Sequence, residues 1–191
     1  MRVAIATAGL LLVAAIAIAS TAVRPATIPP GDPELVEMLS GVDYIPTRGL
    51  IDAQLGGGAA DRLIAIARGT AEESADPGVR IRAYRALALY PGTATEAALR
   101  AGISEHGGGS AIDTLYLRAA AESLVEIAGA EAVDDLVPLL DHQSRDVRAS
   151  AARALGDTGS DAAVSPLRAR LSIEEVGQVR LAIAEALREL E

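Results

Sequence analysis

The sequence contains no cysteine, tryptophan or phenylalanine, and its only aromatic residues are four tyrosines. Without cysteine the chain cannot form disulfides, thiolate metal sites, a cysteine nucleophile or a lipid-modified cysteine anchor. Lysine is also absent, so all 17 basic residues are arginines, and 26 acidic residues bring the net charge to −9. Phosphate binding requires a basic face, so this balance argues against a nucleic-acid partner.

The first part of the chain predicts export. Arg2 provides a short positive start, and residues 3–23 form an uncharged stretch. Residues 17–19 (Ala-Ile-Ala) are typical of signal-peptidase cleavage before Ser20. An uncleaved anchor is the alternative, because about 20 apolar residues span a bilayer. Both interpretations predict an exported domain, periplasmic or extracellular, which the second would hold at the cytoplasmic membrane by residues 3–23.

A proline-rich segment separates this start from the rest. Residues 24–33 hold four prolines and a glycine, a composition that excludes a regular element. A short helix is predicted at residues 33–40, with proline at its first position. The predicted organisation is a signal peptide or anchor at 1–23, a tether with a short helix at 24–45, and a repeat domain at 46–191.

From residue 46 onward the sequence repeats at a period of about 31 residues. Four segments share an apolar i, i+4, i+8 pattern, which lies on one face of a helix. These are Val79-Ala83-Leu87, Tyr116-Ala120-Leu124, Val147-Ala151-Leu155 and Val179-Ile183-Leu187. A second apolar pattern follows in each unit, as in Val133-Leu136-Leu140 and Val164-Leu167-Leu171, after a glycine-containing turn. The repeat therefore predicts helical hairpins, and no segment shows the alternation expected of strands.

The best-preserved unit resembles the HEAT-repeat family, in particular its short bacterial form named after phycobilin lyases. Residues 146–159 read DVRASAARALGDTG and residues 163–167 read AVSPL, close to the pattern of that family. The resemblance implies an all-α fold, a short right-handed α-solenoid of about four and a half HEAT-like hairpins, closed by a single helix at about 173–190. One hairpin cannot bury its apolar face alone, whereas stacked neighbours share a continuous core.

Three units place an arginine directly after the leading valine, at Arg80, Arg148 and Arg180. One interpretation is a row of anion-binding groups. We favour a structural ladder, in which Asp76 and Asp146 cap the helices or pair with these arginines. Such pairs are expected to recur wherever the unit recurs.

The resemblance also implies that the second helices of the units line a concave surface. Arg100 and Arg168 directly follow the core leucine of two of these helices, and Arg62, Asp134 and Asp135 precede it in two others. Together they form a mixed stripe that is suited to an extended peptide or a protein edge, with the arginines as anchors. Ordinary solvated helix faces are the alternative.

Catalytic signals are sparse. His106 and His142 are the only histidines, and together with Glu105 and Asp141 they have the chemistry of a zinc or iron site. HEAT-repeat hydroxylases carry repeated His-Glu pairs, whereas each histidine here follows a single acid, so we expect no metal. The lyase name implies a pigment pocket, against which the scarcity of aromatic residues argues. No nucleophile triad or phosphate-binding glycine motif is present, so we expect no cofactor and no enzyme activity.

The sequence thus predicts an exported, non-catalytic HEAT-repeat scaffold that binds a protein partner through its concave helical surface. It predicts contact with the membrane only through the N-terminal segment. Two alternatives stay open. One is a membrane-anchored structural or assembly protein, and the other is a lyase-like or metal-dependent HEAT-repeat enzyme.

Overall fold

The computed structural model describes residues 31–41, 46–107 and 110–191 of the chain. The predicted export segment and most of the predicted tether lie outside these residues. Within them the regular structure is entirely helical, with no strand, as predicted. The α-helices are α1 (Pro33–Ser40), α2 (Arg48–Leu55), α3 (Ala59–Ala67), α4 (Pro77–Ala86), α5 (Thr93–Glu105), α6 (Ala111–Ala128), α7 (Val133–Leu136), α8 (Arg145–Asp157), α9 (Val164–Ile173) and α10 (Gly177–Leu190). Short 3-10 segments are η1 (Gly56–Gly58), η2 (Glu72–Ala75), η3 (Leu87–Leu89), η4 (Gly129–Ala132), η5 (Val137–Asp141) and η6 (Asp161–Ala163).

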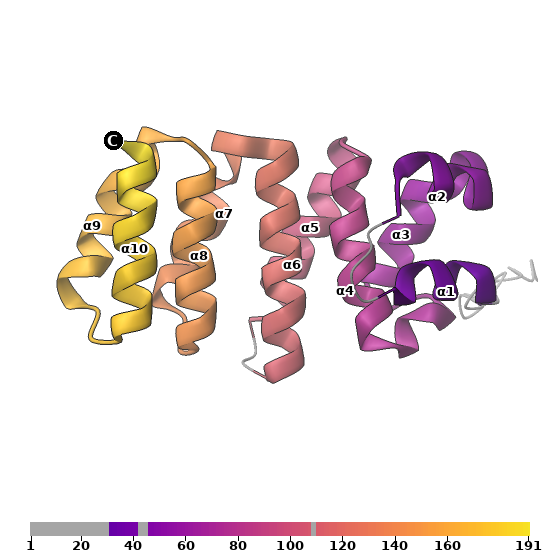
Figure 1. Cartoon of the computed structure of the whole chain (residues 1–191), viewed down its shortest axis with the longest axis horizontal. Helices are drawn as coiled ribbons and strands as arrows, with labels where there is room; N and C mark the ends of the chain where they lie inside the picture. The colour runs from indigo at the N-terminus through magenta and orange to yellow at the C-terminus, as the bar shows by residue number, and fades with distance from the viewer. Residues whose placement is uncertain (1–30, 42–45, 108–109) are drawn as a thin grey trace, which may run out of the picture.

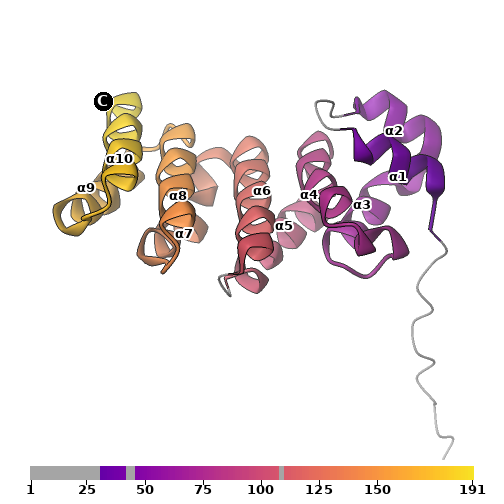
Figure 2. The ribbon, with the colours of Figure 1, turned by 60° about the horizontal axis from the view of Figure 1, so that its bottom comes forward.

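The helices stack in two rows along the long axis of the molecule (Figure 1). Helices α4, α6, α8 and α10 form the first row, in which each helix packs on the next. Helices α3, α5, α7 and α9 form the second row behind it, and the turned view in Figure 2 shows the same stacking. The hairpins are α2/α3, α4/α5, α6/α7 and α8/α9, followed by the single helix α10. This confirms a short helical solenoid with the predicted number of units.

The core lies between the two rows and between successive units. Every residue of the four apolar stripes is buried, because the spacing of the stripe places its side chains on the inner face of a first-row helix. Small residues allow close stacking. A Cβ on Gly156 of α8 would lie only 2.9 Å from the Cα of Ala186 in α10. The glycine therefore sets the distance between these two helices.

Helix α1 belongs to the packed array, which corrects its assignment to the tether. Asp32 caps the helix by accepting hydrogen bonds from the backbone N–H groups of Glu34 and Leu35. Leu35 and Leu39 are fully buried, and α1 packs on α4. Burial of these two leucines places one face of this short helix in the core. The packed domain therefore includes α1 and does not begin at residue 46.

Two helix boundaries differ from the sequence prediction. In the third unit, α7 is only one turn long and continues as η5, because Pro138 has no N–H to donate to the preceding turn. At the end of the chain, α9 extends to Ile173 and α10 begins at Gly177. Between them the Glu174 carboxylate accepts a hydrogen bond from the backbone N–H of Val176 at 2.9 Å, which holds the turn.

Candidate interaction surface

All five residues predicted to bind a partner lie on the second row of helices. Arg62 is on α3, Arg100 on α5, Asp134 and Asp135 on α7, and Arg168 on α9. Each side chain is exposed or half-buried. All five residues thus belong to one row of helices, and they differ in the contacts that each side chain makes.

Arg100 is bound to acidic residues of its own chain. Its Nε donates to the Asp135 carboxylate at 2.9 Å, and its Nη1 donates to Glu96 at 3.0 Å. These hydrogen bonds, of which the one to Asp135 has the largest effect, raise the pKa of the Arg100 guanidinium above its ordinary value. Two residues of the predicted stripe, Arg100 and Asp135, therefore meet as one ion pair between neighbouring units.

The other two arginines of the stripe are also paired. Arg62 lies 2.6 Å from the Glu73 carboxylate, whose side chain is completely buried. Arg168 lies 2.7 Å from Glu191 at the end of the chain, in a largely exposed pair. Asp134 is the exception, because it is exposed and forms no hydrogen bond or ion pair with the described part of the chain. A partner that used these arginines as anchors would have to compete with their internal acids.

Ion pairs of this kind connect the successive elements of the second row. The pairs are Arg68–Glu105 between the ends of α3 and α5 at 2.6 Å, Arg100–Asp135 between α5 and α7 at 2.9 Å, and Arg170–Asp141 between α9 and η5 at 3.0 Å. Exposed pairs contribute only about 0–1 kcal/mol each, so their main effect is to fix side-chain positions. None of these three pairs was predicted from the sequence, although Arg100 and Asp135 were both assigned to the stripe. The partners in each pair are about one repeat apart, so acids one repeat away from each arginine were the available signal.

A groove lies between η5 and α9 and has a volume of about 270 Å³. Val137, Leu140, Pro166 and Ala169 supply apolar walls, and both members of the Arg170–Asp141 pair line it. Ile173 lies at one side of the groove and is 66% exposed. This is the highest exposure of any large hydrophobic residue in the described part of the chain. We call this the η5–α9 groove. It combines an exposed apolar side chain with a charged rim, which is the composition of an interface centre.

The three arginines of the predicted ladder do not line the second-row surface. Each donates to backbone carbonyl oxygens at the end of the preceding second helix, where the last carbonyls of a helix have no partner within it. The hydrogen bonds are Arg80 to Ala67, Arg148 to His142 and Gln143, and Arg180 to Leu171 and Glu174. These contacts tie each unit to the next.

The acids of the ladder behave differently from one another. Asp76 caps α4 by accepting from two backbone N–H groups at its start. Asp146 neither caps α8 nor pairs with Arg148, because residues two apart on a helix point to different sides. Arg148 instead pairs with Glu174 of the next unit, at 2.8 Å, and both side chains are nearly buried. The hydrogen bond from Arg148 is the main cause that lowers the pKa of Glu174 to about 2.

The two histidines lie near the same edge of the molecule. His106 is buried, its ring packs against Tyr116 with centroids 4.8 Å apart, and its Nδ1 lies 3.1 Å from the Asp113 carboxylate. His142 lies with Nε2 3.0 Å from the carbonyl oxygen of Gly107, the residue after His106. Among the described residues, no three acidic or histidine side chains group as ligands for a metal ion.

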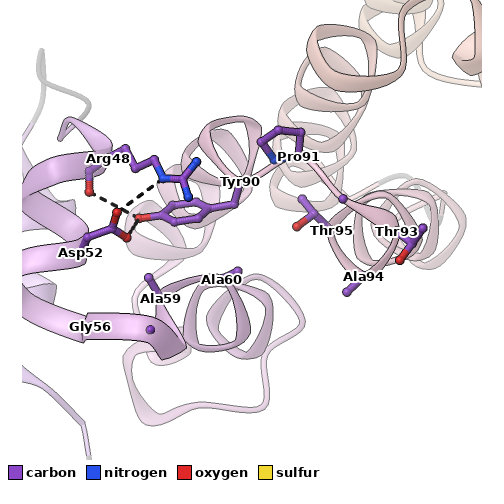
Figure 3. Close-up of a pocket in the computed structure, with 12 residues that line it drawn as sticks. Arg48, Asp52, Gly56, Ala59, Ala60, Tyr90, Pro91, Thr93, Ala94 and Thr95 are labelled. Atoms are coloured by element: carbon purple, nitrogen blue, oxygen red, sulfur yellow. Dashed lines mark hydrogen bonds and ion pairs between the residues drawn. The ribbon is translucent and has the colours of Figure 1, made fainter.

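A second, larger hollow of about 710 Å³ lies near the other end of the array, between α2–α3 and the start of α5 (Figure 3). We call it the N-terminal cleft. The Tyr90 hydroxyl donates to the Asp52 carboxylate at 2.8 Å, and the Arg48 guanidinium lies 4.9 Å from the centre of the Tyr90 ring. Burial, followed by the hydrogen bond with Asp52, raises the pKa of Tyr90 to about 12. No pattern in the sequence predicted this cleft.

Two rows of stacked helical hairpins, joined between units by arginine contacts, define an α-solenoid repeat protein. The comparison of sequences specifies the family: residues 112–188, from α6 to α10, match the model of HEAT repeats. This match confirms, for residues 112–188, the resemblance to HEAT repeats that was predicted from the best-preserved unit. Its relation to the phycobilin-lyase type stays a prediction.

No curated protein matches the sequence. In the part of the chain that the structure describes, every helix is too short or too polar to traverse a lipid bilayer.

Proposed function

We propose that this protein is a non-catalytic scaffold that binds a protein partner on the second row of its helices, centred on the η5–α9 groove. HEAT repeats generally act as protein-interaction scaffolds. The observation that carries the proposal is the exposure of Ile173 beside the Arg170–Asp141 pair, within the segment that matches HEAT repeats. The groove replaces the predicted arginine anchors as the centre of the contact.

The rim of the groove is held in place before any partner arrives. Arg170 is mostly buried and donates to Glu174 at 2.7 Å as well as to Asp141 at 3.0 Å. Glu174 is in turn fixed by Arg148 of the first row. Because these side chains are already ordered, a partner loses less conformational entropy on binding than it would at a mobile surface.

The apolar wall supplies the driving force. Burial of apolar surface contributes about 25 cal/mol per Å², and Ile173 has most of its side chain still exposed to water. A partner that places an apolar side chain against Ile173 and polar groups toward Arg170 and Asp141 would satisfy both kinds of contact. This arrangement, with an apolar centre and a charged rim, is typical of protein interfaces.

A pair of matched variants tests this proposal. Ile173→Asp places a charge in the groove, and Leu181→Asp makes a similar change at a residue that is 60% exposed on α10 of the first row. The full-length protein and both variants are immobilised and exposed to the native cell-envelope fraction, after circular dichroism has verified their helix content. We expect a partner to be retained by the wild type and by Leu181→Asp, and lost with Ile173→Asp. A partner that binds all three proteins equally would refute the groove as the contact.

The proposal includes export of the protein, with residues 1–23 as a signal peptide. Mass spectrometry of the protein isolated from its host measures the mature N-terminus. A chain that starts at or near Ser20 supports cleavage and a released domain. A chain that retains residues 3–23 and fractionates with membranes supports the membrane-anchored structural alternative.

A further inference from the structure

We infer that the N-terminal cleft is a binding site for a carboxylate, and that the ligand it suits best is the C-terminal carboxylate of an extended peptide from a protein partner. The inference rests on the proposal that the array binds proteins. It concerns a different surface, at the opposite end of the array from the η5–α9 groove, and it is tested separately.

One wall of the cleft is the first turn of α5, formed by Thr93, Ala94 and Thr95. The first N–H groups of a helix have no acceptor within the helix. Gly92 at the N-cap position has no side chain to accept from them, and no side-chain cap is formed. The start of this helix therefore offers hydrogen-bond donors, together with the positive end of the helix dipole, to an anion in the cleft.

A polar side chain in the same wall has no partner among the described residues. Thr95 is only 3% exposed, and its hydroxyl makes no hydrogen bond with any part of the chain that the structure describes. Thr95 lines the cleft, and Figure 3 shows its hydroxyl oxygen directed into it. The hydroxyl oxygen faces the open cleft, where a ligand can reach it. An oxygen of a bound carboxylate would accept from this hydroxyl.

The opposite wall supplies a cation. The Arg48 guanidinium lies over the Tyr90 ring, with Nε 3.4 Å from Asp52 and Nη1 3.3 Å from the carbonyl oxygen of Leu89. Its Nη2 forms no hydrogen bond with the described residues and can donate to a ligand. The Asp52 carboxylate, which accepts from Tyr90, keeps a negative charge nearby. This charge repels a doubly charged phosphate more strongly than a singly charged carboxylate.

The shape of the cleft suits a peptide end. Gly56, Gly57, Ala59 and Ala60 line the side away from α5, and these small residues leave room for a main chain with small side chains. The volume of about 710 Å³ is within the range of sites that hold small ligands. Capture of a C-terminal carboxylate by backbone N–H groups is a recurring mode of peptide recognition. Free small organic acids share the carboxylate chemistry, so the experiment includes one.

The test is a titration of the full-length, ¹⁵N-labelled protein followed by amide chemical shifts. The three probes are an N-acetylated tetra-alanine peptide with a free C-terminus, the same peptide with a C-terminal amide, and acetate. We expect saturable shifts at the amides of Thr93, Ala94 and Thr95 with the free-acid peptide, and none with the amide. Acetate that binds those amides as tightly as the peptide would overturn the peptide assignment in favour of a small organic acid.

A pair of matched variants tests whether the Thr95 hydroxyl contributes to binding of the peptide. Thr95→Val has nearly the same shape, loses the hydroxyl, and should weaken binding of the free-acid peptide about tenfold, because a hydrogen bond to a charged group is lost. Thr114→Val makes the same change at the outer surface of α6 and should leave the affinity unchanged. Unaltered affinity in Thr95→Val, equal shifts with acid and amide peptides, or no saturable shift at millimolar peptide would each refute the site.

The outcome is independent of the η5–α9 groove. Thr95→Val is also included in the capture experiment with Ile173→Asp. A partner captured through Ile173, together with no saturable binding of the free-acid peptide, would leave the proposed scaffold function standing while refuting the carboxylate site. Binding of the free-acid peptide without capture of any partner through Ile173 would support the carboxylate site and refute the groove as the contact.

Discussion

The substitution Glu174→Gln should destabilise the protein strongly at neutral pH and only weakly in acid. Glu174 lies in the extended turn between α9 and α10, and its side chain is 2% exposed. It accepts hydrogen bonds from Arg148 on both carboxylate oxygens, at 2.8 and 3.0 Å, and from Arg170 at 2.7 Å. Glutamine keeps the size of the side chain but removes the charge that balances these two arginines.

The magnitude follows from two independent arguments. Removing one partner of a buried ion pair costs about 3–5 kcal/mol, because the other charge is left uncompensated. The hydrogen bond from Arg148 is the main cause that lowers the pKa of Glu174 from 4.5 to about 2. At about 1.4 kcal/mol per pKa unit, this shift corresponds to about 3 kcal/mol in the free energy of unfolding at neutral pH. Both arguments therefore give a loss of about 3 kcal/mol or more.

The sign of the pH dependence is fixed by the direction of the shift. A carboxylate whose pKa is lower in the folded state stabilises the protein above the pKa of the unfolded chain, here 4.5. That contribution is lost as the pH falls through the folded value of about 2. The difference in unfolding free energy between wild type and Glu174→Gln should therefore shrink from about 3–5 kcal/mol at about pH 7 to about 1 kcal/mol at about pH 3.

Urea denaturation of both proteins across this range measures the difference. Glu175→Gln is the matched control, since Glu175 is the next residue, is exposed, and forms no ion pair with the described residues. We expect it to change the unfolding free energy by less than about 0.5 kcal/mol. A carboxyl-carbon NMR titration of Glu174 gives a second measurement. A titration midpoint near 4.5, or a difference from Glu174→Gln that does not depend on pH, would contradict the reasoning.

Two further substitutions probe the packing. Leu155→Ala removes a completely buried side chain of α8 and should lower the unfolding free energy by about 2–5 kcal/mol; an unchanged melting temperature would show that the assigned helix register is wrong. Gly102→Ala would place a Cβ 2.6–2.9 Å from ring and hydroxyl atoms of the fully buried Tyr84, and should destabilise the protein by about 1–3 kcal/mol despite the higher helix propensity of alanine. A Gly102→Ala protein that melts at or above the wild-type temperature would mean that Tyr84 can move aside.

The helical repeat was predictable because its signal is local. Each stripe, such as Val147-Ala151-Leu155, encodes the inner face of one helix in the spacing of three residues, and the structure buries all of them. Helix α1 shows the limit of this signal. Its sequence predicts a helix but not a packed one, because whether Leu35 and Leu39 find a neighbour depends on how the chain returns to α4.

The candidate site was predictable only in its location. The sequence placed Arg62, Arg100 and Arg168 on the second helices, where the structure also has them. The sequence did not decide which acid each one meets, because a charged side chain on a helix face can reach either neighbour or solvent. The groove at Ile173 was missed for a related reason. A lone isoleucine near a helix end resembles a core residue until the stacking of the units shows that none of the described residues covers it.

The sequence alone thus determined the hairpin unit, the number of units and the row to which each helix belongs, because these depend on apolar spacing within about 31 residues. The tertiary structure alone decided which charges meet, as with Arg148 and Glu174, and where the surface is hollowed, as in the η5–α9 groove and the N-terminal cleft. Those features join residues of different units. Their geometry is set by the distance and angle at which neighbouring helices pack, and no single repeat encodes either quantity.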